Sequence, residues 1–387
     1  MAGLADPNIT PFAEAKDASD ATTFPTKKVE AWQYLNLNYL KKFEEDESIA
    51  SKSDSTLLPT YMKDAFFLSA NELYGSIPEK ITTELAPISN PYPNEDYFSN
   101  LNQSLNESVT TLNFKEKEST TANLVIQLKN NPVNWTRLHL NINNLSEVNL
   151  TLHFNHPENA ESHSHFELSA NLEAGSKLNL QLAHSSSNQS VILKNSNIIL
   201  KRDSNLNIYD FGVNTKTVRH KFNIHLTEEN AEASIHACQF LNEDNQGHHY
   251  IEMNHLVPHC RSNQFFKNLL LDKARSSFDG TVFVKKDANG TEAHQLNNNL
   301  ILSDSARAYT KPRMKIKASD VACDHGATVG ALEKDEVFYL VSRGLSEEQA
   351  KNILALGFLK EPMTECPNQD LFEWWFSSQT SSLTNIT

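Results

Sequence analysis

The sequence predicts a mainly β protein with helical segments before and after the strand region. Between about residues 119 and 316, short runs such as "NLVIQLK", "VNLTLHF" and "HKFNIHL" alternate apolar and polar residues. Alternation with a period of two is typical of strands that bury one face, and the Asn-, Ser-, Asp- and Gly-rich segments between them predict turns rather than helices. The pattern allows a sandwich, a barrel, a propeller or a β-solenoid. Strand pairs that recur at roughly twenty residues favour the solenoid, a stacked β-helix, while a sandwich stays open.

Helical periodicity flanks the strand region. "PTKKVEAWQYLNLNYLKKF" spaces apolar residues at helical intervals, so we expect helix between about residues 24 and 74, and the Pro- and Asn-rich residues 86–100 should form a loop. After residue 330, "KDEVFYLVSRG" predicts a helix that ends at Gly344, and "LSEEQAKNILALGF" opens with a capping box of Ser346 and Gln349. "DLFEWWFSSQ" predicts a third short helix. The expected domains are a helical domain with a linker over 1–110, a strand core over 111–330 and a helical domain over 331–387.

Charge and composition exclude several classes of partner. The formal net charge is −14, which disfavours nucleic acid and anionic membranes because both require a positive face. The first residues have no positively charged and apolar leader pattern, and no apolar run is long enough to cross a bilayer. The four cysteines are scattered and form no C-x-x-C pair, which favours free thiols in a reducing compartment. We therefore expect a cytoplasmic protein.

A histidine-rich stretch, "GHHYIEMNHLVPHC", suggests a zinc site as one alternative. It contains His248, His249, His255, His259 and Cys260. In a strand, residues four apart share a face but lie about 13 Å from each other, which is too far to bind one ion. A structural zinc site also needs four ligands that close a tetrahedron. Solvated histidines, or histidines hydrogen-bonded in the core, are the favoured interpretation.

The second candidate site is "VACDHGATVG", residues 321–330, where Asp324 separates Cys323 from His325. If this segment is extended, the cysteine and the histidine point to the same face, roughly 6–7 Å apart. Thiolate and imidazole suit iron–sulfur chemistry or zinc, provided that a second chain supplies further ligands. The alternative is a buried cysteine and a hydrogen-bonded histidine at the end of the strand domain. The chain has no nucleophile elbow, phosphate loop or dinucleotide fingerprint, so any ATP in the pathway must bind to another subunit.

Several sequence blocks together resemble the SufB/SufD family of iron–sulfur cluster assembly proteins. The blocks "SSFDGTVFV", "QLNNNLILSDSARAYTKPRMKI", "HGATVG" and "FYLVSRGLSEEQA" follow the family's distinctive order over about residues 248–359, and "VEAWQYLNL" resembles an N-terminal motif of its SufD branch. Asn297 occupies the position of a cysteine in the SufB branch, and Gly326 replaces a glutamate there. The chain therefore resembles the SufD branch, which lacks the sulfur-accepting cysteine.

The resemblance implies a right-handed parallel β-helix between two helical domains. It also implies a non-catalytic scaffold in a complex of one SufB, two SufC ATPase subunits and one SufD subunit. His325 would face the assembly site and hold metal transiently, shared with SufB, while Cys323 would lie beside it. Asp324 would be an added weak ligand, an orienter of His325 or, as we favour, a solvated turn residue. The chain alone would bind no stable cofactor, and a nascent iron–sulfur cluster would form at the SufB interface.

The same resemblance makes the C-terminal helices, about residues 334–360, the docking face for SufC. The residues expected on this face are Tyr339, Arg343, Gly344, Ile353, Leu354, Gly357 and Phe358. Whether the isolated chain forms a homodimer stays open. Two other functions remain alternatives to the scaffold: a β-solenoid carbohydrate-active enzyme, such as a polysaccharide lyase, and a zinc-binding protein.

Overall fold

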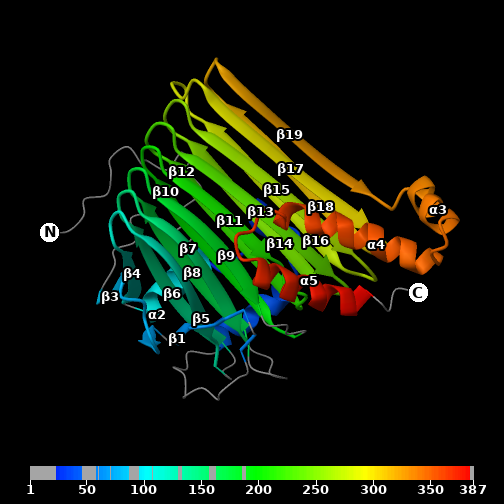
Figure 1. Ribbon diagram of the computed structural model, residues 1–387, viewed down its shortest axis with the longest axis horizontal. Helices are drawn as coiled ribbons and strands as arrows, with labels where there is room; N and C mark the ends of the chain where they lie inside the picture. Colours follow the sequence, from blue (N-terminus) through cyan, green and yellow to red (C-terminus); the bar gives the residue numbers. More distant parts are fainter. Residues whose placement is uncertain are drawn as a thin grey trace.

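A computed structural model of the chain describes residues 23–45, 58–59, 61–69, 71–86, 96–106, 108–129, 133–156, 163–184 and 189–383. Its main body is a long stack of strands (Figure 1). The strands of the stack are β4 (Val109–Phe114), β5 (Ser119–Gln127), β6 (Val133–Ile142), β7 (Glu147–Asn155), β8 (His163–Leu172), β9 (Lys177–His184), β10 (Val191–Leu200), β11 (Asn205–Phe211), β12 (Thr217–Leu226), β13 (Glu232–Leu241), β14 (Gln246–His255), β15 (Arg261–Leu270), β16 (Arg275–Val284), β17 (Thr291–Ile301), β18 (Arg307–Ile316) and β19 (Val321–Gly330).

Consecutive strands of the stack belong alternately to two sheets, and this alternation defines a parallel β-solenoid. Sheet A has the order β19-β17-β15-β13-β11-β9-β7-β5-β1-β2, and sheet B has the order β18-β16-β14-β12-β10-β8-β6-β4-β3. Strands β4 to β19 pair in parallel with the strand two places along the chain. The predicted solenoid is confirmed, and the sandwich alternative is wrong.

The turns of the solenoid are longer than the roughly twenty residues that the sequence suggested. His248 pairs with Ser277 and Asn268 pairs with Asn299, which are 29 and 31 residues apart. Each turn holds two strands of about ten residues as well as two corners, so one turn contains two periods of the strand pattern. Side chains that point inward from both sheets, such as Leu150, Leu180 and Ile224, form one continuous core.

The described part of the N-terminal region contains less helix than predicted. Its elements are η2 (Glu30–Trp32), η3 (Leu37–Lys41), α1 (Lys42–Glu45), β1 (Phe66–Ser69), β2 (Glu72–Tyr74), β3 (Ile81–Ala86) and α2 (Tyr97–Leu105). Helix was expected up to residue 74, but residues 66–69 and 72–74 are strands that extend sheet A. Residues 46–57 of that prediction lie outside the described residues. Residues 87–95 of the loop expected at 86–100 lie outside the described residues, and the prediction is wrong from residue 97, where α2 begins after the N-cap Asp96.

Three helices follow the last strand: α3 (Lys334–Ser342), α4 (Glu347–Lys360) and α5 (Gln369–Leu383), with η4 (Glu361–Met363) between the last two. The predicted capping box is present, because Ser346 accepts from the Gln349 N–H and Gln349 accepts from the Ser346 N–H. The predicted third helix, α5, packs Leu371, Phe372 and Trp375 against sheet A (Figure 1). Within the described ranges, no helix is both long and apolar enough to cross a membrane.

Candidate functional site

The predicted Cys-Asp-His stretch forms β19, the last strand of sheet A. Its register on β17 aligns Ala293 with Cys323 and Gln295 with His325. Ala293 and Gln295 are buried inside the solenoid, so the inward face of β19 carries Cys323 and His325. Cys323 packs against the edge of the solenoid core, and burial raises the pKa of its thiol. His325 is exposed, since no described strand lies beyond β19 to cover it.

A layer of buried amide side chains lies one turn beneath His325. The Gln295 Nε2 donates to Gln264 Oε1 at 2.9 Å, and Asn299 donates to Asn297 Oδ1 at 2.8 Å. Gln295 Oε1 and Asn297 Nδ2 have no hydrogen-bond partner in the described part of the chain. Asn297, which the sequence resemblance aligns with a cysteine, is buried inside the solenoid. These groups give the open end a polar floor that can accept a hydrogen bond from an imidazole N–H above it.

Asp324 points to the opposite face of β19, and its place corrects the prediction. It lies within the strand rather than in a turn, in register with His294 of β17. The His294 Nδ1 and Asp324 Oδ2 atoms are 2.6 Å apart, on the outer surface. Asp324 is thus bound to His294 and does not orient His325. The sequence did not reveal this pair because its members are thirty residues apart.

The last strand of sheet B, β18, is covered on its outer face by the N-terminal strap, residues 23–45. Glu30 forms ion pairs with Lys311 and with Arg313, the latter at 2.9 Å, and Arg313 also binds Asp279. Tyr34 stacks on Tyr309 with ring centroids 4.6 Å apart. Glu30 and Tyr34 both lie in the "VEAWQYLNL" motif, so this motif attaches the strap to the end of the solenoid.

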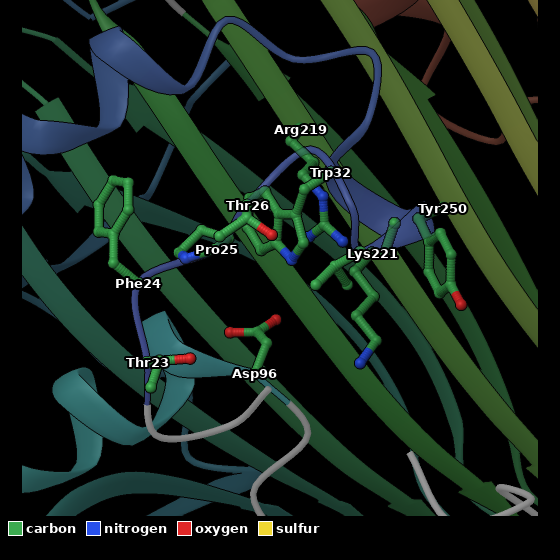
Figure 2. Close-up of a pocket in the computed structure, with 11 residues that line it drawn as sticks. Thr23, Phe24, Pro25, Thr26, Trp32, Asp96, Arg219, Lys221 and Tyr250 are labelled. Atoms are coloured by element: carbon green, nitrogen blue, oxygen red, sulfur yellow. The ribbon is translucent and has the colours of Figure 1, made fainter. Parts of the chain in front are cut away.

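The strap also encloses a cavity over β12 and β14 (Figure 2). The Arg219 guanidinium lies 4.1 Å from the centre of the Trp32 ring, an attractive cation–π geometry. Asp96 and Lys221 face the same cavity (Figure 2), and Asp96 accepts hydrogen bonds from the Ser99 N–H and from Asn195. Trp32 of the motif therefore anchors the strap on β12, and it is not part of the candidate site on β19.

The predicted histidine cluster is dispersed over different faces and bound to protein partners. His248 contacts Ser277 at 2.6 Å, His255 contacts Ser262 at 2.8 Å, and His249 lies 3.5 Å from Asp210. Burial lowers the pKa of His248 to about 3 and that of His255 to about 4, so both are neutral at pH 7. Among the described residues, no group of three or more His, Cys, Asp or Glu side chains could hold a metal ion. The favoured interpretation as hydrogen-bonded core histidines is confirmed for His248 and His255.

Sequence reasoning missed an ionic network inside the solenoid. Lys194 Nζ lies 2.9 Å from Asp210 Oδ1, and His220 Nδ1 lies 2.8 Å from Asp210 Oδ2. Lys194 also contacts His184 at 3.2 Å. The Lys194 and Asp210 side chains are only 2% and 4% exposed. Alternation predicts inward positions but gives no sign that charges occupy them.

The C-terminal helices place the predicted docking residues on two different faces. Helix α3 has no buried residue, and Tyr339 and Ile353 are 56% and 50% exposed. Arg343 lies against the Tyr339 ring, and Gly344 ends α3 with a positive φ of 98°. Leu354 is half-buried and Gly357 is exposed.

Phe358 faces the solenoid instead. It packs against the core cluster between α4 and sheet A, and the Lys267 ammonium lies 4.3 Å from its ring centre. Two exposed apolar residues were missing from the prediction: Phe338 is 72% exposed and Val341 is 38% exposed. Their helical spacing next to Tyr339 was visible in the sequence, but the face that α3 leaves open was not.

A parallel solenoid with a cysteine and a histidine on its last strand agrees with the architecture that the sequence resemblance predicted. The chain belongs to the SufBD family, because the SufBD core domain model of the SUF system for iron–sulfur cluster assembly matches residues 125–358, more than half of the chain. The predicted resemblance to this family is confirmed.

Individual relatives agree with this family. The iron–sulfur cluster assembly protein SufD of Escherichia coli is 26% identical over 373 residues, which cover 88% of this chain and 85% of that protein. An iron–sulfur cluster assembly SufBD family protein of Synechocystis is 38% identical over 168 residues, 43% of this chain and 37% of that protein. A SufBD family protein of Mycobacterium leprae is 26% identical over 198 residues, and the match covers 50% of that protein. The chain thus spans half or less of the last two relatives.

Proposed function

We propose that this chain is a non-catalytic scaffold subunit of an iron–sulfur assembly complex and that it pairs with SufB at the open end of the solenoid. The exposed edges of β18 and β19 support the proposal, since unpaired strand edges are ready-made sites for a second chain. The likeness to E. coli SufD, which covers most of both chains, favours this role over an enzyme of the β-solenoid class. We also propose a right-handed coil, the hand that parallel strand crossovers take in almost all cases.

In this proposal the nascent cluster is a substrate that two chains hold together. His325 offers an exposed imidazole at the open end, with Cys323 partly buried on the same face. SufB supplies the remaining ligands, so neither chain forms a complete site alone. A site shared in this way releases its product more readily than a cage of four thiolates. The observation that carries the proposal is the inward-facing Cys323–His325 pair on a strand that no described strand covers.

Replacement of His325 by alanine tests this assignment. We expect the variant to fold and to assemble with its partners, because an exposed side chain contributes less than about 0.5 kcal/mol to stability. Cluster formation by the reconstituted complex should fall by about tenfold or more, as expected for a lost metal-contacting group. The measurement is the cluster absorbance of the complex after iron and sulfide are supplied. His294→Ala is the matched control, since His294 lies one turn away on the outer face; equal losses in both variants would refute the assignment.

The SufC docking face comprises the exposed residues Phe338, Tyr339, Val341 and Ile353. We expect Ile353→Asp and Phe338→Asp to weaken binding of the ATPase by about tenfold or more, because apolar anchors dominate interfaces. The free energy of unfolding of each variant should stay within about 0.5 kcal/mol of that of the parent. Co-purification and calorimetric titration measure the binding. Leu85→Asp is the control, an equally exposed apolar site on β3 at the other end of the protein.

Phe358→Asp should behave differently from the docking variants. Its ring packs between α4 and the solenoid, so we expect a loss of about 2–5 kcal/mol in folding free energy. The two classes of variant therefore separate docking from folding. If Ile353→Asp unfolds the helices while Phe358→Asp binds the ATPase normally, the proposed docking face is wrong.

A further inference from the structure

The cavity beneath the strap contains a buried cation that forms no ion pair with the described residues. The Arg219 side chain is 2% exposed, and its Nε has no hydrogen-bond partner in the described part of the chain. Its guanidinium contacts aromatic rings instead, with the centre of the Trp32 ring 4.1 Å away and that of the Tyr250 ring 5.6 Å away. Ring contacts supply only part of what a counter-ion gives to a buried charge. Arg219 therefore has unused capacity to bind an anion.

The acidic side chains near Arg219 are bound to other groups. Three carboxylates are close enough to interact electrostatically with the guanidinium, and each has a different partner. These pairs are Asp96 with the Ser99 N–H at 2.9 Å, Glu252 with the Tyr250 hydroxyl at 3.1 Å, and Asp279 with Arg313. Among the described residues that line the cavity, the charged ones are Arg219, Lys221 and Asp96, so its wall carries a net positive charge (Figure 2). These charges favour an anion as the ligand.

The size of the cavity and the apolar part of its wall narrow the kind of anion. The cavity has a volume of about 70 Å³, which is room for roughly five to seven water-sized groups. Such a space excludes nucleotides and flavins, whose pockets are several times larger. Phe24, Val29 and Trp32 of the strap also line it. An inorganic phosphate would leave oxygen atoms against this apolar side, whereas a carboxylate on a short hydrocarbon chain would not.

We propose that the cavity beneath the strap binds a small monocarboxylate, with the Arg219 guanidinium as its anion-binding group. A guanidinium and a carboxylate match in shape and can pair through two parallel hydrogen bonds. The hydrocarbon end would lie against Val29 and Trp32, so the ligand would join the strap to β12. A ligand that binds only when the strap is attached stabilises that attachment. Because the strap also holds β18 through Glu30, the site gives a metabolite influence over the last turn of sheet B, which goes beyond the proposed function and requires neither SufB nor SufC.

Calorimetric titration of the full-length chain with sodium propionate, at an ionic strength held constant with sodium chloride, tests the proposal. We expect one site with a dissociation constant in about the millimolar range, as befits a ligand of this size. Arg219→Met removes the anion-binding group, and Val29→Phe keeps Arg219 but fills the cavity; each should weaken binding by about tenfold or more. Arg137→Met is the matched control and should change binding by less than about twofold, because Arg137 is also buried on the outer face of sheet B but donates to the Asn106 carbonyl at 3.0 Å, outside the cavity. Circular dichroism checks that each variant is folded.

Hydrogen exchange of the unmodified chain gives a second readout that does not depend on the variants. Propionate should slow exchange of the strap amides, residues 23–45, and it should leave those of β19 unchanged. The proposal is overturned if no saturable binding appears up to about 100 mM propionate, or if Arg219→Met binds as well as Arg137→Met. Tighter binding of inorganic phosphate than of propionate would equally show that the cavity is not a carboxylate site.

Discussion

Replacing Asp210 by asparagine is expected to destabilise the protein by about 3–5 kcal/mol, the cost of leaving one member of a buried ion pair uncompensated. Asp210 balances Lys194 at 2.9 Å inside the solenoid and accepts from His220. Burial alone would raise the pKa of the Asp210 carboxyl, but the Lys194 ammonium and the hydrogen bonds from His220 and His249 lower it well below its ordinary value. The carboxylate is therefore charged, and Lys194 depends on it. Urea unfolding monitored by circular dichroism measures the loss.

A double variant shows whether uncompensated charge is the cause. Lys194→Met together with Asp210→Asn removes both charges, so we expect it to recover most of the stability that either single change loses. The surface pair of Lys80 and Glu118, 2.8 Å apart and nearly half exposed, is the matched control. Glu118→Gln should cost less than about 1 kcal/mol. Single variants at Lys194 and Asp210 that fall within that range would contradict the expected coupling.

The protein should lose stability in acid at pH values well above the pKa of its carboxylates. Burial is the main cause that lowers the pKa of His156 and His220 to about 3 and that of His153, His165 and His225 to about 4. These histidines are neutral in the folded state, whereas in the unfolded chain they bind protons below about pH 6.5. The unfolded state then holds more protons, so stability is complete above about pH 6.5 and falls as the pH drops toward the folded pKa values.

The expected size of this acid effect is large. Each such histidine removes about 1.4 kcal/mol per pH unit below its unfolded pKa, and three together would remove about 4 kcal/mol per unit. We therefore expect the urea midpoint to fall steeply between pH 6.5 and pH 5. The variant His225→Gln should show a shallower slope by one proton, measured by urea titrations across this range. A midpoint that is constant from pH 7 to pH 5 would show that these histidines are not buried neutral.

Alternation along the strands was enough to predict where the strand region lies, but not how its strands are connected. "NLVIQLK" and "VNLTLHF" have the same period whether neighbouring strands lie in one sheet or in two, because burial of one face is all that the pattern records. The twenty-residue turn was wrong for the same reason: the pattern marks strands and does not count how many complete a turn. Helix was overpredicted before residue 74, where tertiary pairing with β5 makes Phe66–Ser69 a strand.

At the candidate site, the spacing of Cys323 and His325 predicts that both point to the same face of a strand, and the register on β17 shows that this face is the inward one. The partner of Asp324 could not be read from the sequence, since His294 reaches it only through the register of β17 on β19. The resemblance placed Phe358 on the docking face, and helical periodicity does not say which side of α4 meets the solenoid.

The contact between Glu30 and Lys311 joins residues 281 positions apart, and this has a consequence for biosynthesis. At ribosomal speeds of about 5–20 residues per second, Glu30 leaves the tunnel roughly 15 to 55 seconds before Lys311 does. The coil can grow turn by turn during that interval, and Trp32 can already settle on Arg219 of β12, while Glu30 still has no β18 to bind. Attachment of Glu30 to β18 is thus a late step of folding, and a polypeptide truncated before residue 307 would emerge with its beginning still unattached at that end.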